Sequence, residues 1–285
     1  MAFLKRASLL RLILDVFCFL LIGIPNYLLQ HHGEPFRRGF YCNDESLKYP
    51  YKRDTVTPEF LHFIGIIIPT AVILVNELLR TKRSQNQWYG SSSFVNMYKT
   101  LGGFYFGLIC SELVTNIGKL TIGRLRPHFH SVCVPDVDCK LPQYQDLYIR
   151  YFECLEGNKQ NLREMRMSFP SGHSSFSAYT MLYLAIYVQA RMSFQPAYLV
   201  KNIIQLVCAL IVWWISLSRI SDYKHHWSDV LVGIIIGSLT AFFITFNVSS
   251  LFEKSRSRFK GLPVTVENES TNENFLDSEK PSKLL

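Results

Sequence analysis

The chain has 285 residues, a formal net charge of +8 and a pI near 9.1, and 48% of its residues are hydrophobic. A soluble domain would space its apolar residues periodically, but here they stand in long runs, which are typical of membrane-spanning helices. The sequence therefore predicts an all-α membrane protein. Lys and Arg residues that flank the spans explain the basic charge, and no basic arm or zinc-finger spacing points to a nucleic-acid partner.

Six apolar runs each approach the about 20 residues that a helix needs to cross the hydrocarbon core. They cover residues 7–29, 58–79, 97–118, 173–192, 200–218 and 229–250. The first run is long for a signal-peptide core and lacks a small-residue cleavage site, so we expect a retained helix. Residues 1–260 thus form a six-helix membrane domain. The polar tail, residues 261–285, has too few apolar residues to build a core, and we expect it to be disordered.

Six spans place both termini on one side of the membrane. The Lys and Arg residues on that side favour cytoplasmic termini, although Arg37 and Arg38 make the first outer loop basic as well. The third span carries Glu112 and Asn116, which share a helical face with Lys119. This polar stripe either leads toward a site at Lys119 or forms hydrogen bonds between helices.

Seven cysteines divide between the spans and the predicted outer loops. Cys42, Cys133, Cys139 and Cys154 lie in outer loops, where disulfides are permitted. Four cysteines allow three pairings, and the sequence does not choose among them. Free thiols throughout remain an alternative.

The first cluster of interest follows the third span. Lys119 and Arg126 are seven residues apart, so on a continuing helix they share a face about two turns apart. Pro127 then ends the helix. Two cations at a membrane surface suit a dianionic phosphate, but such cations are more often interface anchors.

The second cluster, Pro170-Ser171-Gly172-His173, opens the fourth span. Ser171 and Gly172 at a helix start expose backbone N–H groups, and the helix dipole favours an anion there. His173 stands beside these groups. The alternative is a capping histidine at the lipid interface.

The third cluster runs from Ser218-Arg219 to His225 and Asp229. His225 and Asp229 are four residues apart, so one helical turn can bring them into contact. A carboxylate on one ring nitrogen fixes the tautomer and leaves the other nitrogen free to attack. The alternative is a helix N-cap with incidental histidines, and we assign His226 to that alternative.

Together the clusters resemble the signature of the lipid phosphate phosphatase family, also called type 2 phosphatidate phosphatases. That signature is a Lys, six residues and Arg-Pro; Pro-Ser-Gly-His; and Ser-Arg, five residues, His, three residues and Asp. All eleven specified residues are present in order, and topology parity puts them on one membrane face. Residues 38–42, 49–51, 123–129 and 221–230 resemble the animal members, and the resemblance extends over all of the chain except the tail.

The resemblance implies hydrolysis of lipid phosphate monoesters: phosphatidate, lysophosphatidate, sphingosine 1-phosphate and ceramide 1-phosphate. The implied phosphate-binding residues are Lys119, Arg126, Ser171, Gly172 and Arg219. His225 would attack phosphorus and become phosphohistidine, while Asp229 orients it. His173 would protonate the leaving alcohol and then activate water.

No metal or other cofactor is expected, because three cations can stabilise the phosphate oxygens and the nearby acidic residues are isolated. The chain departs from animal members in one respect. The loop 119–172 has no Asn-x-Ser/Thr sequon, and the sequons at Asn247 and Asn268 lie on the predicted inner side.

Two other functions remain as alternatives. One keeps the fold but transfers the phosphoryl or head group to another lipid, and the other is a non-catalytic scaffold or lipid carrier. We expect an integral protein of the plasma membrane or endomembranes, with the active site extracellular or luminal. The preferred lipid, the particular membrane and homo-oligomerisation stay open.

Overall fold

This computed structural model describes residues 2–83, 89–192, 199–249 and 251 of the chain. The predicted tail, residues 261–285, lies outside the described residues, and so do the last residues assigned to the membrane domain.

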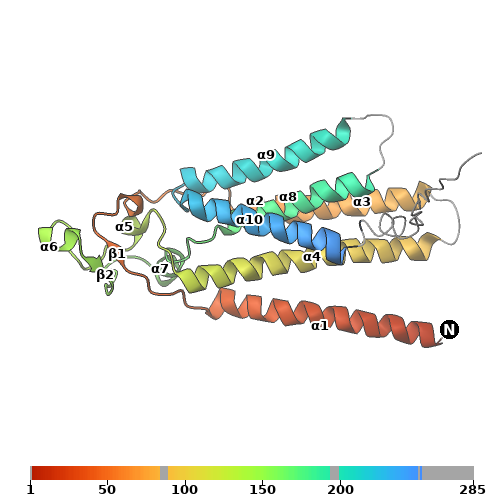
Figure 1. Cartoon of the computed structure of the whole chain (residues 1–285), viewed down its shortest axis with the longest axis horizontal. Helices are drawn as coiled ribbons and strands as arrows, with labels where there is room; N and C mark the ends of the chain where they lie inside the picture. The colour runs from red at the N-terminus through yellow and green to blue at the C-terminus, as the bar shows by residue number, and fades with distance from the viewer. Residues whose placement is uncertain (1, 84–88, 193–198, 250, 252–285) are drawn as a thin grey trace, which may run out of the picture. The chain divides into compact units, whose positions relative to one another are not determined.

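Six long helical stretches carry the described fold (Figure 1). They are α1 (Ala2–His32), the continuous run of α2 (Pro58–His62), π-helical η2 (Phe63–Ile67) and α3 (Ile68–Arg83), α4 (Tyr89–Ile122), α8 (Gly172–Arg191), α9 (Val200–Ser221), and α10 (Trp227–Phe243) with π-helical η3 (Ile244–Val248). The loops at the end opposite the N-terminus hold η1 (Glu45–Leu47), β1 (Phe40–Tyr41), β2 (Tyr148–Ile149), α5 (Phe129–Val132), α6 (Pro142–Gln145) and α7 (Lys159–Glu164).

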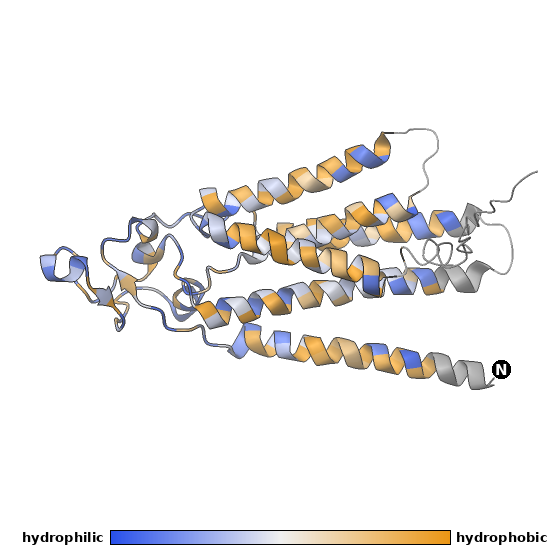
Figure 2. Cartoon of the chain, in the orientation of Figure 1, coloured by the Kyte–Doolittle hydropathy of each residue, from blue (hydrophilic) through white to orange (hydrophobic). Residues whose placement is uncertain are grey.

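Four segments are long and apolar enough to cross a membrane: Leu9–His32, Pro58–Arg80, Val200–Ser221 and Trp227–Val248. Figure 2 shows apolar residues along the long helices and hydrophilic residues in the loops. The protein is therefore an integral membrane protein. The other two predicted spans, 97–118 and 173–192, are helical but are not among these four segments. α8 is rich in Ser and Tyr, and a helix enclosed by its neighbours needs no continuous apolar surface.

Helix α8 is fixed to its neighbours by three buried tyrosines, each one turn from the next. Tyr179 donates to the Phe104 carbonyl at 2.7 Å and Tyr183 to the Thr100 carbonyl at 2.7 Å, both on α4. Tyr187 donates to the Glu77 carboxylate of α3 at 3.0 Å. Within a bilayer, hydrogen bonds and close packing hold helices together, because lipid tails are as apolar as the side chains.

Helix α10 packs against the first turns of α8 through two glycines. A Cβ added at Gly233 would lie 2.6 Å from the Ser171 carbonyl oxygen, and one added at Gly237 would collide with the Ser175 carbonyl oxygen. Because both positions lack a side chain, the two backbones approach closely. This contact places the start of α8 beside the start of α10.

The polar stripe of α4 forms hydrogen bonds between helices. Asn26 of α1 donates to Glu112 at 3.2 Å and accepts from Asn116 at 2.9 Å. Thr115 and Ser175 of α8 share a hydrogen bond of 2.9 Å. Glu112 and Asn116 therefore form hydrogen bonds between helices, which is one of the two roles that the sequence left open for the polar stripe. Lys119 lies further along the same helix.

Two disulfides staple the loops into a second, smaller core. They join Cys42 to Cys139 and Cys133 to Cys154, which is one of the three pairings that the sequence left open. β1 and β2 pair antiparallel with Phe40 opposite Ile149. The core residues around them include Leu125, Phe129 and Met165. This core ties the loop before α2 to the segments that flank Arg126.

The α8–α10 contact yields a stability prediction. We expect Gly237→Ala to lower Tm by about 5 °C, because the added methyl forces two helix backbones apart. Gly102→Ala on α4 is the matched control, because nothing lies within 4 Å of its added Cβ. Alanine is also the better helix former, so the control should keep or raise Tm. Thermal unfolding in detergent measures both, and equal Tm values for the two variants would contradict the packing described.

Candidate active site

Backbone hydrogen bonds join the three sequence clusters. The N–H of Arg126 donates to the Met165 carbonyl at 2.8 Å, and the N–H of Ser168 donates to the Arg124 carbonyl at 3.0 Å. The N–H of Ser171 donates to the Asp229 carbonyl at 3.0 Å. The end of α4, the start of α8 and the turn between α9 and α10 are thus one connected structure.

The start of α8 lies beside the cation Lys119. Ser171 is the N-cap, and its hydroxyl accepts from the N–H of Ser174 at 3.4 Å. The Lys119 ammonium lies 3.0 Å from the position that a Cβ on Gly172 would take. Glycine at position 172 therefore leaves room for the ammonium group at the positive end of the helix dipole.

Arg126 adds a second cation to the same region. Its Nε atom is buried and has no hydrogen-bond partner among the described residues. Burial, as the largest effect, lowers the pKa of Arg126, and the nearby positive charge of Arg219 lowers it further against opposing carboxylates. A buried donor without a partner costs free energy, so this position favours an acceptor such as an anionic ligand.

His225 is held by a backbone carbonyl. Its Nδ1 lies 2.6 Å from the Ser168 carbonyl oxygen, and only 5% of its side chain is exposed. A carbonyl oxygen can only accept, so Nδ1 carries the proton and Nε2 carries the free lone pair. Burial, and then the charges of Arg126 and Lys119, lower the pKa of His225 well below its ordinary value. His225 is therefore neutral at pH 7.

The hydrogen bond expected between His225 and Asp229 is not formed in this structure. The Nδ1 of His225 and the Oδ2 of Asp229 are 3.9 Å apart, which is longer than a hydrogen bond. The four-residue spacing brings the two side chains within 3.9 Å but not into a hydrogen bond, because α10 begins at Trp227 and His225 lies outside the helix. Asp229 instead accepts from the Ser168 hydroxyl at 2.6 Å. It therefore reaches His225 through Ser168.

Asp229 has two further partners that the sequence did not single out. Arg124 forms an ion pair with it at 2.6 Å. His226, assigned above to an incidental role, donates its backbone N–H to Asp229 at 3.0 Å. The Nδ1 of His226 lies 3.2 Å from the same carboxylate. These contacts, together with complete burial, fix the Asp229 carboxylate in one position.

Arg219 is buried between two carboxylates. It forms ion pairs of 2.7 Å with Asp54 of the first outer loop and with Asp222, and only 1% of its side chain is exposed. Thr55 donates to Asp222 through both its N–H and its hydroxyl, at 2.7 Å each. Burial raises the pKa of Asp222, but the Thr55 hydrogen bonds and the Arg219 charge outweigh it and leave the pKa lowered.

His173 contacts the loop that precedes α2. Its Nε2 is 3.2 Å from the Val56 carbonyl oxygen, which belongs to the same loop segment as Asp54. The charges of Arg219 and Lys119 act on His173, and His173 in turn acts on His225. The eight residues nominated from the sequence thus gather in one region.

Sequence reasoning missed Ser168, Arg124, Asp54 and Asp222. Asp222 follows Arg219 by three residues, and that spacing is the signal that could have found it. Ser168 stands two residues before the second cluster but has no pattern of its own. Asp54 is separated from Arg219 by 165 residues, so nothing local could have indicated their ion pair.

The described residues contain no group of three or more His, Cys, Asp or Glu side chains that could hold a metal ion. The carboxylates of this region, Asp54, Asp222 and Asp229, are each paired with an arginine, and the cations Lys119 and Arg126 suit an anion better than a metal.

Comparisons with known proteins find similar proteins that are named as phosphatases. The sequence profile of the PAP2 superfamily matches residues 100–251. Phospholipid phosphatase 1 of Rattus norvegicus is 40% identical over 280 residues, which cover 94% of this chain and 96% of the relative. A putative phosphatidate phosphatase of Drosophila melanogaster is 41% identical over 274 residues, covering 89% of this chain and 72% of the relative.

A solved structure is also similar: the transmembrane PAP2-type phosphatidylglycerolphosphate phosphatase of Bacillus subtilis. It shares 20% identity, with a TM-score of 0.36, over 71% of this chain and 98% of that one.

The environment of His225 yields a pH prediction. Because its pKa is lowered, the neutral form persists as the pH falls below 6.5, the ordinary value. ¹⁵N NMR of histidine-labelled protein in detergent should show His225 as the neutral Nδ1–H tautomer at pH 6.5, where an ordinary histidine is half protonated. The His225→Ala spectrum assigns the signal. A protonation midpoint of His225 at or above the ordinary pKa would contradict this environment, and so would the Nε2–H tautomer.

Proposed function

Because the chain belongs to the PAP2 superfamily, and within it to the lipid phosphate phosphatases, we propose that it hydrolyses lipid phosphate monoesters through a phosphohistidine on His225. The protein is a membrane phosphatase of the phosphatidate and phospholipid type. The proposed substrates are phosphatidate, lysophosphatidate, sphingosine 1-phosphate and ceramide 1-phosphate. One observation carries the mechanism: His225 is held through Nδ1 by the Ser168 carbonyl, which leaves the Nε2 lone pair for attack, and the charges of Arg126 and Lys119 act on this buried side chain.

Phosphate binding is assigned to the cations and to the start of α8. A phosphate monoester carries a charge of about −1.5 to −2 near pH 7 and three acceptor oxygens. Lys119 and the unpartnered Nε of Arg126 supply donors, and the Ser171–Gly172 helix start supplies backbone dipoles. Fixed cations in a buried site stabilise the equatorial oxygens of the transition state, so no metal is required by this mechanism.

Arg219 joins this set by exchanging one partner. Of its two carboxylates, Asp222 is fully buried, whereas 35% of the Asp54 side chain is exposed. Asp54 is therefore the carboxylate that an incoming phosphate would displace. The ion pair with Asp222 would remain and keep the guanidinium oriented.

The first chemical step is attack on phosphorus. The Nε2 lone pair of His225 forms an N–P bond while the bond from phosphorus to the alcohol oxygen breaks. An alkoxide is a poor leaving group, so the proton of His173 goes to that oxygen. Burial disfavours the protonated form of His173 most, and the charges of Arg219 and Lys119 add to this effect, whereas a bound phosphate dianion would favour protonation. Substrate binding therefore precedes protonation of His173.

The second step releases phosphate. The neutral His173 takes a proton from water, and the resulting hydroxide attacks the phosphorus of phosphohistidine. The N–P bond breaks, and its electron pair returns to Nε2 of His225. The Ser168 carbonyl and Asp229 keep the ring in place through both steps.

The membrane arrangement completes the proposal. Six spans place the three clusters on one face, with both termini cytoplasmic and the active site extracellular or luminal. The positive charge flanking the inner ends of the spans supports this orientation. The disulfides between the loops also fit a non-cytoplasmic, oxidising side.

Removing the nucleophile tests the function. Purified protein in detergent should release phosphate from phosphatidate in excess chelator at an undiminished rate. We expect His225→Ala to lose at least about a hundredfold in rate and to trap no phosphoenzyme, because the covalent path is gone. His32→Ala, which changes an exposed histidine of α1, is the matched control and should match wild type. A chelator-sensitive rate restored by Mg²⁺ would refute the mechanism.

The role of His173 is tested by changing the leaving group. We expect His173→Ala to slow phosphorylation by a lipid phosphate about a hundredfold or more, because the alkoxide needs a proton. An activated aryl phosphate should lose far less, because its phenolate leaves unaided. The measurement is the single-turnover burst of released alcohol, since His173 also serves the second step. Equal losses for both substrates would exclude His173 as the acid.

A further inference from the structure

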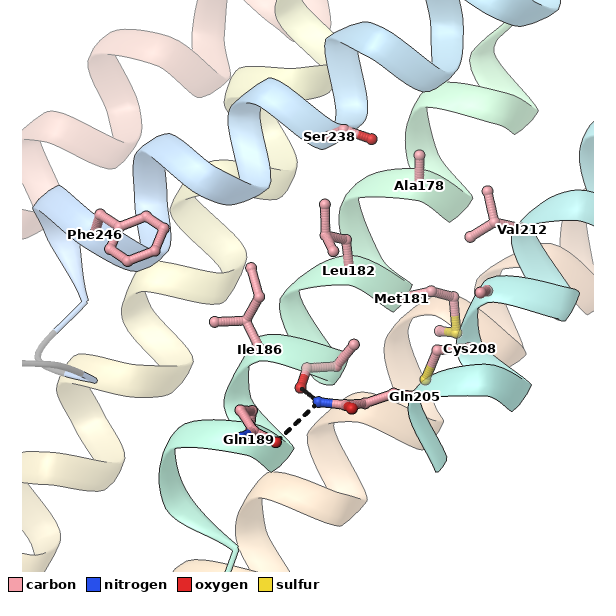
Figure 3. A pocket seen from close by; sticks show the side chains of 12 residues that line it. Ala178, Met181, Leu182, Ile186, Gln189, Gln205, Cys208, Val212, Ser238 and Phe246 are labelled. Atoms are coloured by element: carbon pink, nitrogen blue, oxygen red, sulfur yellow. Dashed lines mark hydrogen bonds between the residues drawn. The ribbon is translucent and has the colours of Figure 1, made fainter. Parts of the chain in front are cut away.

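An apolar groove lies among three of the helices that carry the active site. It has a volume of about 590 Å³ and is lined from α8, α9, α10 and η3 (Figure 3). Its walls include Leu182, Ile186, Cys208, Val212 and Phe246. No step proposed above uses it.

The groove ends in a polar pair at the end far from the active site. The amide of Gln205 on α9 donates to the Gln189 side chain at 3.2 Å and to the Ala185 carbonyl at 3.3 Å. Figure 3 shows these hydrogen bonds crossing from α9 to α8 at one end of the lining. Apart from this glutamine pair, the side chains that line the groove are apolar except for Ser238.

The same helix faces that line the groove carry the phosphate-binding residues further out. On α9, Arg219 follows Val212 by seven residues, which returns to the same face two turns on. On α8, Ser171 precedes Ala178 by seven residues. Each interval corresponds to about 10 Å along a helix. On both walls, therefore, the groove starts at the same depth beneath the site.

We propose that this groove holds one acyl chain of the lipid phosphate, with the Gln205–Gln189 pair marking its inner end. The proposal rests on the proposed function, because it assumes that a lipid phosphate binds at His225. The 10 Å above the groove accommodates the phosphate, the glycerol and the ester, since about six bonds at about 1.2 Å each separate phosphorus from the acyl carbonyl. From Ala178 to Gln189 the groove is about 16 Å deep, which suits about 13 further methylenes.

Shape, rather than hydrophobic transfer, must provide the selectivity of this groove. A lipid tail leaves hydrocarbon to enter it, so burial of apolar area gives no net drive. A chain of matching length packs against both walls and holds the phosphate at the correct distance from His225. A chain that ends short loses these packing contacts, and a longer chain meets the glutamine pair.

The test fills the groove and compares chain lengths. Ala209 lines the groove on α9, whereas its neighbour Leu210 is outside it and 55% exposed. We expect Ala209→Trp to lower kcat/KM for dipalmitoyl phosphatidate by about fivefold or more, and for dihexanoyl phosphatidate by less than about twofold. Leu210→Trp adds the same bulk on the lipid-facing side and should leave both values unchanged. All rates are measured in mixed micelles at fixed surface concentration.

A second variant tests the inner end without adding bulk. Gln205→Ala removes the polar pair, so the preference should shift from dipalmitoyl toward diarachidoyl phosphatidate. If Ala209→Trp loses kcat/KM equally for short and long chains, the groove assignment is overturned. It is also overturned if the chain-length preference does not change in either variant. A wild-type protein that releases no phosphate from any of these lipids would instead refute the proposed function, so the two failures are distinguishable.

Discussion

The proposed active site depends on Ser168, whose three polar groups each hold a different segment. Its N–H donates to the Arg124 carbonyl, its carbonyl accepts from His225 at 2.6 Å, and its hydroxyl donates to Asp229 at 2.6 Å. Because Ser168 is fully buried, each of these groups needs a partner inside the protein. One small residue therefore positions the segment after α4, the turn before α10 and the first turn of α10.

The second constraint is electrostatic. Lys119, Arg126 and Arg219 lie close together in a poorly solvated region, where like charges repel strongly. Asp222 and Asp54 offset Arg219, but the buried Nε of Arg126 keeps a donor to offer. A site built in this way favours an anion. The proposed nucleophile, His225, stays neutral first because it is buried, and then because of the same surrounding positive charge.

The membrane-embedded part supports this site by packing rather than by apolar burial. Tyr183 reaches a carbonyl of α4, and Gly233 and Gly237 let α10 lie directly against α8. Such hydrogen bonds and close backbone contacts retain their value where lipid surrounds the helices. α8 and α9 then continue inward as walls of the groove, so the proposed active site and the proposed tail site are built on the same two helices.

By itself, the sequence determined the membrane character, the helical class and the residues that gather at the site, because apolar runs and motif spacings are properties of local stretches. Only the tertiary structure decided the disulfide pairing, the ion pair of Asp54 with Arg219, and the Ser168 carbonyl as the partner of His225. The predicted contact between His225 and Asp229 assumed one continuous helix, but α10 begins after His225. Contacts between distant segments depend on how the chain packs, and residue spacing carries no information about that packing.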